Sequence, residues 1–258
     1  MATDRELLAA RIFLRAVLPV TKVLLKEDKA IRRRFSRVTA TVGFRAKDPA
    51  GDQAACLAFD KGNLSLSFEP CENPDLEFLF FKVSHMNAFF AGKPAPFWIK
   101  GLLRRPLLLA RVLTLLLGVM ILMPDKRPKD PEKRRLKVKM TFYMITTALS
   151  QYNKGGDPEM TKWTASQPER IYQITVADDI GAWLRVKAGK TQAGRGVYTR
   201  RRPFVHMKFS GVEGALPVVM NDVDMVEAVK RGYLTVEGSP EYGGQLGDFM
   251  VRIQNLKT

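Results

Sequence analysis

The chain has 258 residues, of which 46% are apolar and 26% are charged, and this balance excludes an intrinsically disordered protein. The formal net charge is +16. The excess is spread over both halves, because residues 1–128 hold 21 basic and 12 acidic side chains and residues 129–258 hold 21 and 14. Such a surface favours polyanions, meaning nucleic acid or an anionic membrane.

The cysteines and histidines give no sign of a metal site. The chain has two of each, Cys56 and Cys71 with His85 and His206, and no CxxC or HxxxH spacing. Cys56 lies in an apolar run, which predicts a small buried thiol. Nothing in the sequence demands a disulfide, and the charged first residues do not resemble a cleavable signal peptide. We therefore expect a cytoplasmic protein, with peripheral membrane attachment as an alternative.

Residues 4–25 have the apolar spacing of a helix, and Pro19 is expected to kink or split it. Two interpretations stay open for this segment. It packs on its own domain, or it lies on a membrane as a basic amphipathic helix. The run Arg32-Arg33-Arg34, with Arg37, adds some weight to the second interpretation.

Alternating, β-branched runs follow the first helix and predict strands. The predicted strands are residues 38–44, 55–59, 64–68 and 76–83, with a hairpin turn at 60–63. A short helix over Ser84–Ala91 is expected to end at Gly92.

Leu107–Met123 is the most apolar stretch of the chain. Its 17 residues reach the lower limit for a membrane span. Three interpretations remain: a helix that walls an apolar cavity or interdomain core, a membrane-docking helix, or a true span. We favour the first, because sheet-like sequence lies on both sides and no aromatic belt flanks the stretch.

The charged, proline-rich segment 124–131 is predicted to link two domains, residues 1–126 and 127–258. The second half repeats the order of the first. We predict a helix at 133–152, strands at 170–176 and 181–187 around the turn Ala177-Asp178-Asp179, strands near 196–199 and 204–210, a helix at 222–231, a strand at 233–237 and a last helix from Pro240. Gly243, Gly244 and Gly247 in the last helix indicate close packing or a movable first turn.

The two halves align as an internal repeat. In the first, a helix ends at Gly92 and Ile99-Lys100-Gly101 leads into an apolar helix; in the second, a helix ends at Gly232 and Val236-Glu237-Gly238 leads into an amphipathic one. The segments 221–232, 234–238 and 240–253 resemble the C-terminal part of sterol carrier protein 2 domains, and residues 76–122 resemble a more divergent copy.

The resemblance implies an α+β fold of two sterol-carrier-like domains. Each would have a twisted, mainly antiparallel five-stranded sheet with helices on one face and an apolar tunnel between them. The residues expected to line the tunnels are Phe89, Phe90, Trp98, Leu108, Val112, Leu115, Leu116, Val119, Phe209, Met220, Met225, Leu246, Phe249 and Met250. The family binds sterols, fatty acyl chains or isoprenoids without a catalytic group.

We therefore expect a non-catalytic carrier of a fatty acid, sterol or isoprenoid lipid, without cofactor or metal, that loads at anionic membranes. The alternative is an accessory protein that presents a lipid or quinone intermediate to a partner enzyme. A specific nucleic-acid binder is less favoured, because the basic residues are not interleaved with aromatic ones. An enzyme that uses the tunnel as its substrate site is equally disfavoured, because no acid–base pair is suggested by local spacing.

Overall fold

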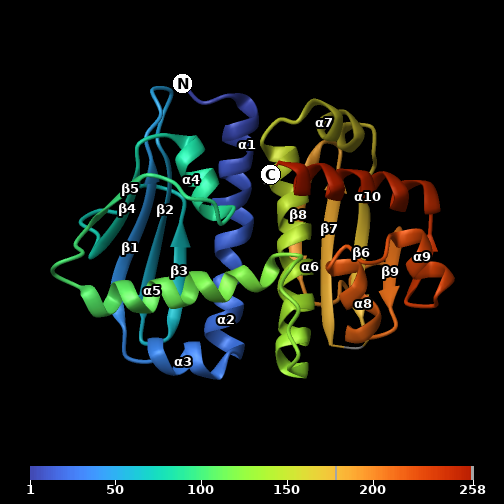
Figure 1. Ribbon diagram of the computed structural model, residues 1–258. Coiled ribbons are helices and arrows are strands. Elements are labelled where there is room, and N and C mark those ends of the chain that lie inside the picture. The colour runs from blue at the N-terminus through green and yellow to red at the C-terminus, as the bar shows by residue number, and fades with distance from the viewer. Residues whose placement is uncertain (178, 257–258) are drawn as a thin grey trace. The chain divides into compact units, whose positions relative to one another are not determined.

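The computed structural model describes residues 1–177 and 179–256. The chain forms two compact units, Met1–Met120 and Ile121–Asn255, and each is described by itself. The division falls a few residues before the linker position expected from the sequence. Each unit holds one five-stranded sheet and its own set of helices (Figure 1).

The first unit begins with a helical segment that changes type along its length. It consists of α1 (Asp4–Ile12), the π-helical turn η1 (Phe13–Val17), the 3-10 turn η2 (Leu18–Val20), α2 (Thr21–Glu27) and α3 (Lys29–Phe35). Thr3 and Glu6 form a capping box at the start of α1. The split around Pro19 agrees with the sequence prediction, since proline has no amide hydrogen to donate. The separate helix α3, which Asp28 caps, was not predicted.

The first sheet has the strand order β3-β2-β1-β4-β5. Its strands are β1 (Thr39–Ala46), β2 (Gln53–Asp60), β3 (Asn63–Ser67), β4 (Leu76–Phe80) and β5 (Phe97–Lys100). The β1–β4 pair is parallel and the other three pairs are antiparallel. Lys61 and Gly62 form the two-residue β2–β3 turn with φ of 47° and 90°, as hairpin turns of the primed types require.

One face of this sheet is covered by helices and the other carries most of its polar side chains. On β1, Val42 and Phe44 are fully buried, whereas Thr41 and Arg45 on the alternate face are half-buried. The covering elements include α4 (Val83–Phe90) and α5 (Pro106–Val119), which continues into the 3-10 turn η3 (Met120–Leu122) (Figure 1).

The second unit repeats this plan. Its elements are α6 (Pro131–Lys154), α7 (Pro158–Ala165), β6 (Arg170–Val176), β7 (Ile180–Lys187), β8 (Lys190–Arg195), β9 (Val205–Phe209), α8 (Val212–Val219), α9 (Met225–Lys230), β10 (Leu234–Gly238) and α10 (Pro240–Asn255). The sheet order is β10-β9-β6-β7-β8, again with one parallel pair, β6–β9. Read from the other end, this order matches that of the first sheet, so the two units share one topology.

Several predictions for the second unit need correction. The strand expected near residues 196–199 is absent from the described chain there, and the third strand is β8. Its sequence KTQAGR lacks apolar alternation, so pairing with β7 decides its conformation. The helices α7 and α8 were not predicted. The expected turn at residues 177–179 includes Asp178, which lies outside the described residues.

Two equivalent glycines show why the repeat is visible in the sequence. Gly101 directly follows the edge strand β5 and Gly238 is the last residue of the edge strand β10, and their φ angles are 82° and 97°. A Cβ atom at Gly101 would lie 2.1 Å from the carbonyl oxygen of Asp75, and one at Gly238 would lie 2.0 Å from that of Phe204. Both carbonyls immediately precede the neighbouring strand, so both units demand glycine at this position.

Cys56 on β2 and Cys71 in the following loop form a disulfide, with Cα atoms 5.1 Å apart. The predicted free thiol at Cys56 is therefore wrong. Cys56 pairs with Gly43 on β1, and a Cβ at Gly43 would lie 3.5 Å from Cys71 Sγ. The sulfur of Cys71 therefore lies over a position of β1 that has no side chain. Disulfides are rare in reducing compartments, and this one weighs against the cytoplasmic location expected from the sequence.

Within the described residues, no helix has both the length and the apolar character that crossing a bilayer requires. The predicted apolar helix 107–123 is the 14-residue α5 followed by η3.

Candidate functional site

The space between sheet and helices in the first unit is filled by phenylalanine rings. Phe89 on α4 contacts three rings of the sheet, with centroids 5.2 Å from Phe97, 5.3 Å from Phe80 and 6.0 Å from Phe78. Phe90 stacks on Phe13 at 5.5 Å. Both α4 rings remain half-buried although they belong to this cluster. The predicted pair Phe89 and Phe90 therefore lies on the helix-covered side of the sheet.

Helix α5 contributes further interior residues to the first unit. Leu108, Val112 and Leu115 are buried at spacings of four and three residues, which places them on one helix face. The neighbouring predicted residues Leu116 and Val119 are half-buried. Helix α5 packs against α2 and α3, and a Cβ at Gly118 would lie only 2.9 Å from Ile31 Cδ1 and 3.2 Å from Leu24 Cδ1.

Trp98 does not join the interior set. It alternates with Phe97 and Ile99 along β5, pairs with Leu79 on β4 and is 64% exposed on the sheet face opposite the helices. The sequence prediction took the aromatic side chain as a lining residue, but the period-two geometry of the strand sends it to the other face.

The second unit has a more polar aromatic interior. Trp163 on α7 lies 5.4 Å from both Tyr172 on β6 and Phe249 on α10, measured between ring centroids. Its Nε1 atom donates a hydrogen bond to Gln245 Oε1 at 2.6 Å. The Tyr172 hydroxyl donates to Gln167, and burial raises the pKa of Tyr172. Phe249 was among the predicted lining residues, whereas Tyr172, Gln167 and Gln245 were not.

Arg170 stands at the edge of this aromatic group. Its guanidinium carbon lies 3.9 Å from the centre of the Phe204 ring and 4.3 Å from that of Tyr242, an arrangement that cation–π attraction favours. The group therefore combines apolar rings with a cationic side chain at its edge.

The other predicted residues of the second unit are distributed over several elements. Phe209 is buried on β9 with its ring 5.2 Å from Phe142. Leu246 and Phe249 are buried on α10, and Met250 on the same helix is half-buried. Met220 and Met225, at the end of α8 and the start of α9, are also half-buried.

Of the three helical glycines, only Gly243 has neighbours within contact distance. A Cβ there would lie 3.5 Å from Val205 Cγ1, whereas a Cβ at Gly244 or Gly247 would meet open space. A separation of 3.5 Å is an ordinary van der Waals contact, so close packing requires none of the three glycines.

Polar clusters occupy the opposite faces of both sheets, and sequence reasoning did not find them. On β4, the buried carboxylate of Glu77 forms ion pairs with Arg45 Nε at 2.9 Å and with Lys100 Nζ at 3.0 Å. At the equivalent place on β9, His206 Nε2 lies 2.9 Å from Thr175 Oγ1 and 3.2 Å from Gln173 Nε2. A lone charged residue in an apolar strand, such as Glu77 in LEFLF, was the available signal.

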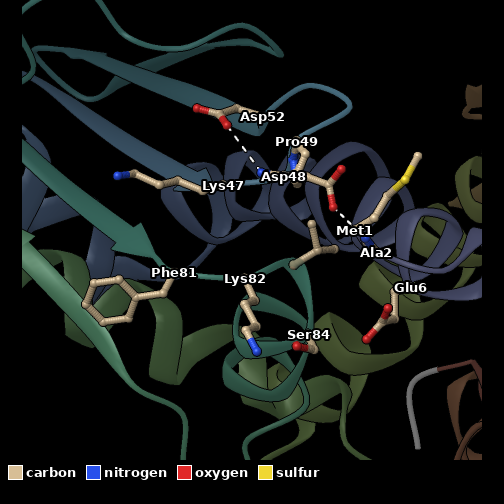
Figure 2. Close-up of a pocket in the computed structure, with 11 residues that line it drawn as sticks. Met1, Ala2, Glu6, Lys47, Asp48, Pro49, Asp52, Phe81, Lys82 and Ser84 are labelled. Carbon is tan, nitrogen blue, oxygen red and sulfur yellow. Dashed lines mark hydrogen bonds between the residues drawn. The ribbon is translucent and has the colours of Figure 1, made fainter.

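A pocket of about 730 Å³ opens in the first unit (Figure 2). It is lined by Met1, Ala2, Glu6, Lys47, Asp48, Pro49, Asp52, Phe81, Lys82, Val83 and Ser84. Asp48 accepts hydrogen bonds from the backbone of Ala50 and Ala2, which lower its pKa. None of the predicted lining residues belongs to this pocket. Its walls carry charges of both signs, so they suit a polar group better than an acyl chain.

Among the described residues, no three His, Cys, Asp or Glu side chains are grouped so that they could hold a metal ion. The polar clusters on the open sheet faces are ion pairs and hydrogen-bonded side chains with structural partners.

No protein-family model and no curated protein matches the chain. Among solved structures, two similar ones are a double mutant of the sec-alkylsulfatase PisA1, at 11% identity and a TM-score of 0.29, and the stereoselective inverting sec-alkylsulfatase Pisa1 from Pseudomonas sp., at 12% and 0.25. The alignments cover 58% and 63% of this chain but only 28% and 31% of those proteins. At these scores the similarity carries no argument about function.

Proposed function

We propose that the protein binds and carries a lipid-like apolar molecule, a fatty acyl chain, sterol or isoprenoid, between sheet and helices, without catalysing a reaction. The proposal includes membership of the sterol-carrier-like family. It is supported by the shared topology of the two sheets and by the equivalent glycines Gly101 and Gly238.

The observation that carries the proposal is the half-buried aromatic surface of α4. Phe89 and Phe90 belong to a cluster of apolar rings, yet both residues are only half-buried. Helix α5 of the same unit is apolar except for Arg111 and Thr114. An apolar molecule that bound at α4 would contact the rings of Phe89 and Phe90.

The binding energy would come from burial of the ligand. Each buried methylene is worth about 0.8 kcal/mol, so twelve carbons contribute roughly 10 kcal/mol before ordering costs are subtracted. The result is affinity in the micromolar range, which suits a carrier that must also release its ligand.

The direct test is native mass spectrometry of the intact protein, followed by organic extraction of bound molecules. A stoichiometric lipid or isoprenoid supports the proposal, and its number per chain tells whether both units bind. A protein that purifies empty and also takes up neither a fluorescent fatty acid nor a fluorescent sterol would contradict it. Co-purification of one enzyme with a lipid-loaded chain would favour the accessory role.

A matched pair of variants locates the site in the first unit. Phe89→Ala removes a ring from the interior cluster and should weaken binding of a fluorescent fatty acid about tenfold. Phe81→Ala removes a 53% exposed ring that lines the polar pocket, and it should leave the affinity unchanged. If Phe81→Ala weakens binding and Phe89→Ala does not, the ligand binds in the pocket of Figure 2 instead.

A further inference from the structure

The exposed apolar side chains of the first unit concentrate in one part of the chain. Residues 78–124 contain six Lys or Arg and no Asp or Glu. Seven of the twelve large apolar side chains that are exposed in the described protein fall within this stretch. They are Phe81, Trp98, Leu102, Leu103, Leu107, Leu113 and Leu117.

Helix α5 turns an apolar face outward as well as inward. Leu107 and Leu117 are 64% and 65% exposed, Leu113 is 39% exposed, and Ala110 between them is exposed too. These positions recur every three or four residues opposite the buried stripe, so they form one outward face without a charged residue. Just before the helix, Leu103 is 95% exposed.

The equivalent helix of the second unit behaves differently. Helix α10 follows β10 as α5 follows β5, and it buries Leu246, Phe249 and Ile253. Its outward positions include Glu241, Asp248, Arg252 and Gln254. The shared topology therefore does not require an apolar outer face, and the one on α5 is a special feature of the first unit.

Basic residues border the outward face of α5. Helix α3 packs beside α5, with Ile31 against Gly118 and Arg34 Nη1 3.3 Å from Thr114 Oγ1. The exposed residues of α3 and its end include Arg32, Arg33, Arg34 and Arg37, and none of these four forms an ion pair with a described residue. Arg104, next to Leu103, is likewise exposed. Nearby, Asp28 is engaged as the cap of α3.

We propose that the outward face of α5, with Leu103 and the arginines of α3, docks on the surface of an anionic lipid membrane. The helix would lie in the interfacial plane, because its 14 residues are too few to span a bilayer and its outer face is apolar between cationic borders. Anionic lipid headgroups complement the arginines, and the leucines enter the boundary between headgroups and acyl chains. The docking surface deepens the proposed carrier function, which requires contact with membranes.

The test measures co-sedimentation of the full chain with vesicles of phosphatidylcholine alone and of phosphatidylcholine with phosphatidylglycerol. We expect binding to the anionic vesicles at low salt, weaker binding at high salt and much weaker binding to neutral vesicles. No binding to anionic vesicles at low salt overturns the proposal. Because this assay detects vesicles and native mass spectrometry detects cargo, the two proposals fail separately.

A double variant identifies the surface. Leu107→Glu with Leu117→Glu should raise the apparent Kd for the anionic vesicles at least about tenfold, since complete burial of one leucine corresponds to about that factor. The matched control is Val226→Glu with Val251→Glu, which changes two valines of α9 and α10 that are 66% and 55% exposed. The control alters the net charge equally and should bind as the unchanged protein does.

Equal loss in both variants overturns the assignment to α5, because charge alone would then explain it. The occupant is a second copy of the chain instead if sedimentation velocity shows a dimer that only the α5 variant dissociates while vesicle binding is unaffected. Far-UV circular dichroism and thermal unfolding of both variants establish that each is folded.

Discussion

The contrast between Leu115 and Leu117 on α5 gives a sharp prediction about packing. Leu115 is fully buried, whereas Leu117 is 65% exposed, although only one residue separates them on the same helix. Replacing Leu115 with alanine removes buried carbons and leaves a cavity, which costs about 3 kcal/mol, within a usual range of roughly 2–5 kcal/mol. Replacing Leu117 with alanine should change the free energy of unfolding by less than about 0.5 kcal/mol.

Urea denaturation followed by circular dichroism measures both variants. Because the chain forms two compact units, each unit can unfold in its own transition. The transition that Leu115→Ala shifts is the one that reports on the first unit. In the vesicle assay the order should reverse, with weaker docking for Leu117→Ala. A Leu115→Ala protein as stable as the unchanged protein would refute our assignment of Leu115 to the inward face of α5. A Leu117→Ala protein destabilised by more than about 2 kcal/mol would refute our assignment of Leu117 to the outward face.

Three further predictions follow from individual groups. Reducing the Cys56–Cys71 disulfide, whose cysteines are 15 residues apart, should lower the free energy of unfolding by about 3 kcal/mol. Denatured protein that has not been reduced should take up no thiol label, and labelling of both cysteines would refute the pairing. Burial, together with the nearby Lys208, lowers the pKa of His206, so the folded state binds fewer protons than the unfolded state. Stability should therefore fall as the pH drops below about 6.5. Thermal unfolding at a series of pH values should show a smaller fall for His206→Gln than for the unchanged protein. The buried ammonium of Lys137 donates hydrogen bonds to three backbone carbonyls at 2.7–3.0 Å. Lys137→Met should therefore lower the free energy of unfolding, measured with urea, by about 3 kcal/mol. An unchanged urea midpoint would mean that the carbonyls find other partners.

Local patterns predicted much of the fold. The helix over 84–91 is α4 within one residue, and the hairpin around residues 60–63 forms with Lys61 and Gly62 at positive φ. Such features depend on neighbours in the chain, so sequence spacing is sufficient. The edge strand β8 shows the opposite case, because a polar hexapeptide becomes a strand only when β7 offers it backbone partners.

The candidate site was predictable in part. Phe89 and Phe90 lie on the helix-covered side of the sheet, and Leu108, Val112 and Leu115 form the buried stripe of α5 that their apolar periodicity indicates. Trp98 does not lie on that side of the sheet, because residue type alone cannot tell which face of an edge strand a side chain occupies. Whether these residues bind a ligand stays a prediction.

By itself, the sequence determined two repeated α+β halves, the helix and strand periods within them and the glycines that their turns and edge strands require, since these follow from local backbone geometry. Only the tertiary structure decided three other features. It joined Cys56 to Cys71, set Glu77 between Arg45 and Lys100, and left the outer leucines of α5 exposed. Each depends on which segments meet across the fold, and the spacing of residues along one chain does not contain that information.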